Sequence, residues 1–114
     1  MYTKEQANNL FRIAAKARTK EWNLLKLAEE CSELSAAIIQ HITKDCSEVE
    51  IQNEIGDVEI MIDILKIIYS NKVIENSKQN KYKKIENKLI LFFDISFNFL
   101  VGITIEIGYL RPNM

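Results

Sequence analysis

The stretch LKLAEECSELSAAI, residues 25–38, decides the fold class of this chain. Its apolar residues recur every three or four positions, which is the spacing of a helix that packs against a core. The same stretch places Glu29, Glu30 and Glu33 within about one and a half turns, with Lys26 as the only nearby cation in the sequence. Like charges three or four residues apart on a helix repel each other. A helix that carries this repulsion in mid-length needs something to offset it.

The stretch belongs to the second of four expected helices. Thr3 and Gln6 form a capping box, and the apolar spacing that follows predicts a first helix over residues 4–18. The second helix is expected over residues 22–42. Its apolar stripe, expected in the core, consists of Leu24, Leu27, Ala28, Cys31, Leu34, Ile38 and Ile42.

A third helix follows a short polar connection, TKDCS, at residues 43–47. Ser47 and Glu50 predict a second capping box, and the helix is expected to end near Ser70. Its apolar stripe consists of Ile51, Ile55, Val58, Ile62, Leu65 and Tyr69. Gly56 in its interior costs roughly 1 kcal/mol relative to Ala, so it predicts close packing or a nearby ligand.

The C-terminal part of the sequence changes in character. A polar, lysine-rich helix is expected over residues 73–89. Residues 89–114 are rich in β-branched and aromatic side chains, and a strand, a buried helix and a loosely ordered tail are all open for them. Asp94 and Glu106 interrupt this segment, which argues against a membrane span. We therefore expect a helical domain over residues 1–88 and an apolar extension over 89–114.

Composition narrows the class of protein. A chain of 114 residues with 47% apolar residues fits one domain with its own core. The N-terminus has no apolar signal-peptide core, which predicts a cytoplasmic protein with reduced thiols, and Cys31 is expected to be a buried, inert one. The middle of the chain is strongly acidic, so nucleic acid is not an expected partner.

Two pairs of carboxylates are spaced alike on the second and third helices. Glu30 and Glu33 are three residues apart, as are Glu54 and Asp57, so each pair shares one helix face. Helices joined by so short a connection pack antiparallel, and the two pairs then lie at similar depth. Four carboxylates are expected to converge with no cation from either helix. Mg²⁺ prefers oxygen ligands and would complete such a cluster.

These residues also form a paired motif, EExxE at residues 29–33 and ExxD at residues 54–57. Over residues 22–88 the sequence resembles the MazG-like, all-α nucleoside triphosphate pyrophosphohydrolases. The resemblance implies that water attacks the α-phosphorus, which gives a nucleoside monophosphate and pyrophosphate. It also implies Mg²⁺, with Mn²⁺ as a possible substitute. The implied metal ligands are Glu30, Glu33, Glu54 and Asp57, and the implied catalytic residues are these four and Glu29.

The resemblance extends to substrate binding and assembly. Lys83, Lys84 and Asn87 match positions where relatives place phosphate-binding groups, although a solvated lysine-rich helix explains them too. Trp22, with Asn23, is a candidate for binding base or ribose, with core packing as the alternative for the tryptophan. Relatives pair into four-helix cores, so a homodimer or a dimer of dimers is expected. The apolar positions that such a core would bury are Leu27, Leu34, Ile38, Ile55, Val58, Ile62 and Leu65.

Other functions stay open at this point. Within the same superfamily, the substrate could be phosphoribosyl-ATP, dUTP or dCTP. A di-iron carboxylate bundle requires Glu-x-x-His, but the residue three before His41 is Ile38, so His41 is instead expected to pack or cap near the helix end. A non-enzymatic helical module whose acidic face binds a basic partner would show neither Mg²⁺ dependence nor hydrolysis.

Overall fold

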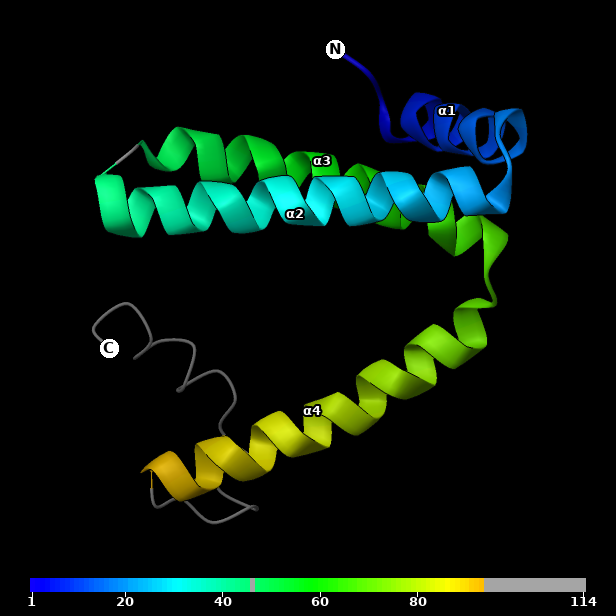
Figure 1. Cartoon of the computed structure of the whole chain (residues 1–114). Coiled ribbons are helices and arrows are strands. Elements are labelled where there is room, and N and C mark those ends of the chain that lie inside the picture. The colour runs from blue at the N-terminus through cyan, green and yellow to red at the C-terminus, as the bar shows by residue number, and fades with distance from the viewer. Residues whose placement is uncertain (46, 94–114) are drawn as a thin grey trace. The chain divides into compact units, whose positions relative to one another are not determined.

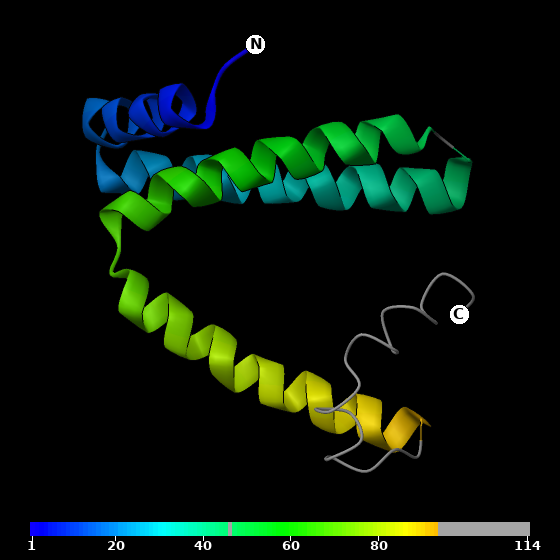
Figure 2. The same cartoon turned by 180° about the vertical axis from the view of Figure 1, so that it is seen from behind.

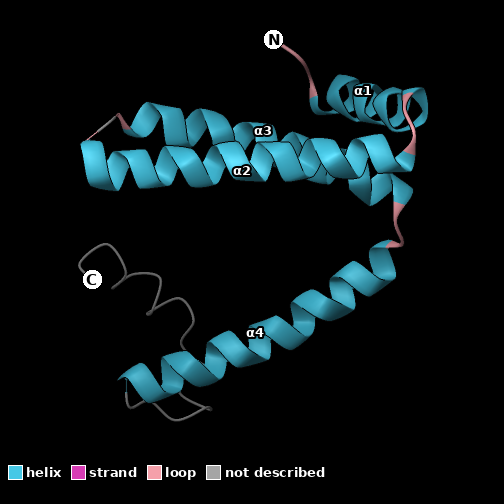
Figure 3. Ribbon diagram, viewed as in Figure 1, coloured by secondary structure: helices cyan, strands magenta, loops and turns pink. Residues whose placement is uncertain are grey.

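The computed structural model describes residues 1–45 and 47–93, and every regular element within them is an α-helix (Figure 3). The helices are α1 (Lys4–Ala17), α2 (Lys20–Lys44), α3 (Glu48–Ile68) and α4 (Asn71–Phe93). The all-α fold expected from the sequence is confirmed. By its internal contacts the chain divides into two units, Met1–Asn71 and Lys72–Met114, which are described separately.

The helix ends follow local capping. The capping box at α1 is present: the Gln6 N–H donates to Thr3 Oγ1 at 3.1 Å, and the Thr3 N–H donates to Gln6 Oε1 at 2.9 Å. The second helix begins two residues before its expected start, because Thr19 Oγ1 accepts from the Trp22 N–H at 3.1 Å. It ends where Asp45 adopts a left-handed conformation with φ 54°.

The start of α3 and the extent of α4 differ from the expectations. Ser47 caps α3, but its hydroxyl accepts from the Val49 N–H at 3.1 Å, so the expected capping box with Glu50 is replaced by a shorter-range contact. The C-terminal cap of α3 is Tyr69, with extended backbone. Helix α4 continues to Phe93, beyond the expected end at residue 89. The structural alternatives for residues 94–114 lie outside the described residues.

Helices α2 and α3 lie side by side and antiparallel, and α1 packs against α3 near the end where α2 begins (Figures 1 and 2). The apolar side chains that are buried within the described residues are Ala37, Met61, Ile64 and Leu65. Three of these four lie in the C-terminal half of α3. In the residues that the structure describes, no helix is long and apolar enough to cross a membrane.

The contact between α2 and α3 has a seven-residue pattern. Most buried or half-buried positions of α2 follow this pattern, namely Asn23, Leu27, Glu30, Leu34, Ala37 and His41. In α3 the same spacing links Ile51, Glu54, Val58, Met61, Leu65 and Ile68. Lys26, Ile64 and Lys66 are also buried or half-buried but lie beside this row. Alternating steps of four and three residues are those of two helices packed along a coiled-coil seam. One glutamate from each helix therefore takes a position in the seam that an apolar residue would normally fill.

This seam differs from the expected apolar stripes. In the single chain several residues of those stripes are exposed, and their expected burial against a second hairpin stays a prediction. Leu24, Ile38 and Ile42 are exposed on α2, since the buried face is rotated by about one residue from the predicted one. Ile55, Ile62 and Tyr69 of the predicted α3 stripe are exposed as well. Cys31 is exposed rather than buried, because its neighbour Glu30 occupies the seam position.

Candidate functional site

The four carboxylates that the sequence pairs do converge in the structure. Glu30 and Glu54 lie in the seam, and Glu33 and Asp57 follow each of them by one turn of helix. One carboxylate oxygen from each of the four can be chosen so that all lie within 4.8 Å of one another. The expected match in depth along the hairpin is thus found, because α2 and α3 run antiparallel from a short connection.

Two oxygens of this carboxylate cluster are buried without a hydrogen-bond partner. Glu30 as a whole residue is only 8% exposed, and Glu54 is half-buried. The Oε2 atom of each accepts no hydrogen bond in the structure. An unsatisfied buried polar atom costs stability, and a carboxylate costs more than a neutral group. Burial removes the water molecules that would otherwise hydrogen-bond to these oxygens. Each oxygen is therefore available to a ligand that takes the place of this water.

The carboxylates also raise one another's pKa values. The charge of Glu30 is the main reason that the pKa of Glu33 lies above its usual 4.5, with burial contributing next. For Glu54 burial is the largest cause of the raised pKa, followed by the charges of Glu33 and Asp57. Both shifts oppose ionisation, so negative charge at the cluster is only partly compensated by the described residues.

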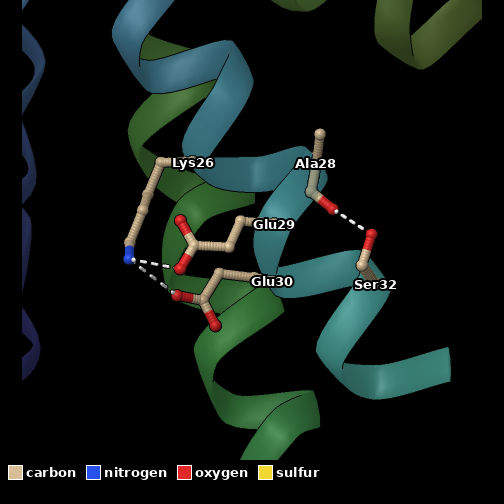
Figure 4. A network of polar contacts seen from close by, with 5 residues as sticks. All are labelled: Lys26, Ala28, Glu29, Glu30 and Ser32. Carbon is tan, nitrogen blue, oxygen red and sulfur yellow. Dashed lines mark hydrogen bonds and ion pairs between the residues drawn. The ribbon is translucent and has the colours of Figure 1, made fainter. Parts of the chain in front are cut away.

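Among the described residues, Lys26 supplies a positive charge that offsets part of this negative charge. It lies one turn before Glu30 on α2. Its Nζ lies 3.4 Å from Glu29 Oε1 and 3.4 Å from Glu30 Oε1 (Figure 4). The expectation that neither helix would supply a cation was therefore wrong, because an i to i+4 spacing brings the lysine back over Glu30. The negative charge of Glu29 is the main reason that the pKa of Lys26 is raised.

Glu29 lies outside the cluster of four and faces solvent more than Glu30 does. Its side chain is 56% exposed against 11% for Glu30. Together with Trp22, Leu25 and Lys26 it lines a shallow pocket of about 240 Å³ along α2. The hydroxyl of Ser32, on the next turn of the helix, donates to the Ala28 carbonyl at 3.0 Å (Figure 4). Its hydrogen bond is therefore made within α2.

The two candidates for binding base or ribose have different surroundings. Trp22 is 42% exposed and lines the pocket, and the Arg18 guanidinium lies 4.8 Å from its ring centre, so core packing was the wrong alternative. Asn23 is 1% exposed in the seam, and its Nδ2 donates to the Thr19 carbonyl at 3.0 Å. Asn23 therefore has a structural role at the start of α2, while Trp22 is accessible to a ligand.

The remaining sequence candidates lie in the second unit or at the end of the seam where α2 ends. Lys83, Lys84 and Asn87 are exposed on α4, where their three- and four-residue spacing places them on neighbouring positions of one surface. His41 Nε2 lies 3.5 Å from Glu48 Oε1, so it joins the end of α2 to the start of α3.

Gly56, between Glu54 and Asp57, is not required by close packing. A Cβ atom added to it would meet nothing within 4 Å, and its φ is not positive. Close packing within this chain therefore does not explain the glycine, and the alternative of a nearby ligand stays a prediction.

The donor set of the carboxylate cluster fits a hard divalent cation. Four carboxylates supply oxygen ligands alone, as Mg²⁺ and Mn²⁺ prefer, and the two unpartnered buried oxygens gain a partner when a cation binds. Sequence reasoning located all four residues but missed that two of them occupy seam positions. The signal was present as a seven-residue spacing through Leu27, Leu34 and His41.

Comparisons with protein-family models, with curated proteins and with solved structures gave no match.

Proposed function

We propose that this chain is a Mg²⁺-dependent hydrolase that converts a nucleoside triphosphate into a nucleoside monophosphate and pyrophosphate. The observation that carries the proposal is the carboxylate cluster, in which two pairs from antiparallel helices come within 4.8 Å and leave two buried oxygens unpartnered. A protein selected only for stability would place apolar residues at these two seam positions. The paired EExxE and ExxD spacing adds the reaction class by resemblance.

The five carboxylates of the paired motif have separate proposed roles. Glu30, Glu33, Glu54 and Asp57 would hold Mg²⁺, which when bound neutralises charge on phosphate oxygens. Glu29, next to Glu30 in the sequence but outside those four, pairs with Lys26 and is the proposed residue for orienting the attacking water.

The substrate would extend from the cluster along α2. The nucleoside would occupy the pocket lined by Trp22, which is 42% exposed. The resemblance also makes Lys83, Lys84 and Asn87 of α4 proposed phosphate-binding residues, and within their own unit all three are exposed on one surface.

A second copy of this chain is the proposed partner. Several apolar side chains of the hairpin face solvent: Ile38, Ile39, Ile42, Val49, Ile55, Ile60 and Ile62. Two hairpins could bury them in a four-helix core, as a homodimer or a dimer of dimers. Light scattering at micromolar concentration tests this point, and a monodisperse monomer would contradict it.

The reaction is tested by measuring pyrophosphate release with Mg²⁺ from a panel containing the common ribo- and deoxyribonucleoside triphosphates and phosphoribosyl-ATP. The panel includes dUTP and dCTP, so it also identifies the preferred base. Glu33→Gln and Asp57→Asn should each lower activity by roughly 100-fold, since each removes a ligand from the cation. Glu59→Gln is the matched control, because Glu59 is an exposed carboxylate on α3 outside the cluster.

Full activity in both cluster variants would refute the residue assignment. The acidic-face interaction module predicts a different result, in which no nucleotide is hydrolysed and calorimetric titration with Mg²⁺ gives no binding heat. That pair of results would refute the proposed function.

A further inference from the structure

Lys26 stands between the two parts of the proposed site. Its ammonium group pairs with Glu30, which belongs to the carboxylate cluster. The same group pairs with Glu29, and both residues line the pocket beside Trp22. Among the described residues Lys26 is the cation whose ion pairs reach the cluster, against four carboxylates. Its contact with Glu30 uses Oε1 and leaves Oε2 without a hydrogen-bond partner.

We propose that Lys26 is a displaceable counter-ion: it pairs with Glu30 in the metal-free protein, leaves Glu30 when a divalent cation binds, and then contacts the phosphate chain of the substrate. This inference rests on the proposed function and adds to it a residue that couples the binding of metal to the binding of substrate.

The contacts of Lys26 are those of a pair that exchanges easily. Both N···O distances are 3.4 Å, longer than the 2.7–2.9 Å or so of a strong charge-assisted hydrogen bond, and the lysine side chain is 35% exposed. The pair with Glu29, whose side chain is 56% exposed, contributes little to stability. In the pair with Glu30, a bound divalent cation would replace the lysine as the positive charge beside the buried carboxylate. Lysine is a point charge on a flexible stem, so its ammonium group can change partners without moving the helix.

A divalent cation at the cluster makes the exchange favourable. It competes with Lys26 for Glu30 and repels the ammonium group over a few ångströms. Once released, the group still borders the pocket along α2, where a phosphate chain reaching from the cation towards Trp22 would pass. A static support of Glu30 would behave differently, because losing Lys26 would then weaken the binding of both the cation and the phosphate.

The experiment measures the two binding steps separately, without hydrolysis. Mn²⁺ alone is titrated by electron paramagnetic resonance, and inorganic tripolyphosphate is titrated by calorimetry at saturating Mn²⁺. Lys26→Met keeps the length of the side chain and removes its charge. We expect it to bind Mn²⁺ roughly three- to tenfold more tightly and tripolyphosphate at least about threefold more weakly. Lys26→Arg should resemble the wild type in both titrations.

Lys44→Met is the matched control, since it removes one exposed positive charge from the other end of α2 and should change neither affinity. Lys26→Gln replaces the methionine variant if that variant does not fold. Opposite shifts for Mn²⁺ and tripolyphosphate support the counter-ion role, and any other combination overturns it. A wild-type protein that binds no Mn²⁺ refutes the proposed function, whereas Mn²⁺ binding and hydrolysis with an unshifted Lys26→Met variant refutes only the role of Lys26.

Discussion

Gly56→Ala should stabilise the protein. Gly56 lies inside α3 with helical backbone, and the added methyl group would meet nothing within 4 Å, so the substitution introduces no clash. Alanine loses less backbone entropy than glycine when a helix forms. The expected gain is about 0.5–1 kcal/mol. At roughly 4–8 °C per kcal/mol for a domain of this size, the melting temperature should rise by about 2–8 °C.

Thermal unfolding followed by circular dichroism, at fixed protein concentration and without metal, measures this gain. Ala36→Gly is the matched reverse change, because Ala36 is an exposed position inside α2. It should lower the melting temperature by a similar amount. The pair of variants separates backbone entropy from any general effect of altering the hairpin.

A melting temperature that stays the same or falls in Gly56→Ala, while Ala36→Gly destabilises as expected, would refute this reasoning. It would mean that the open side of α3 is covered by another molecule in solution, such as the proposed second copy. Pyrophosphate release by the alanine variant decides the other interpretation of this glycine: unchanged activity excludes a ligand close to Gly56, since the methyl group would displace it.

Two further predictions concern titration and exposure. The folded-state pKa of Glu33 is raised, so the native protein binds this proton more tightly than the unfolded chain, and the metal-free protein should lose stability as the pH rises from 4.5 through the raised value. Melting curves between pH 4 and 8 should show a smaller loss for Glu33→Gln than for wild type, and equal slopes would contradict the coupling to Glu30. Cys31 is exposed, so Ellman's reagent should modify one thiol more, rapidly and under native conditions, in the wild type than in Cys31→Ser. Equal thiol counts would place Cys31 in a covered surface.

Much of the fold follows from local sequence. Thr3 and Ser47 mark helix starts because their hydroxyls satisfy N–H groups that have no partner within the helix. The polar connection at residues 43–47 is too short for anything but an antiparallel neighbour. Helix starts and a short connection are sufficient to bring Glu30, Glu33, Glu54 and Asp57 to the same depth, so helical spacing and chain connectivity alone predict the carboxylate cluster.

The buried face of each helix could not be determined in this way. On α2, apolar residues occupy adjacent positions at Leu24 and Leu25 and again at Ile38 and Ile39, so helical periodicity alone fits more than one stripe. Only contact with α3 selects the seam, and the selected seam contains Glu30 while leaving Cys31 exposed. The burial of a carboxylate, and with it an oxygen without a partner, depends on what the facing helix covers. The sequence by itself therefore determined which carboxylates meet, and the tertiary structure decided which of them lose their water.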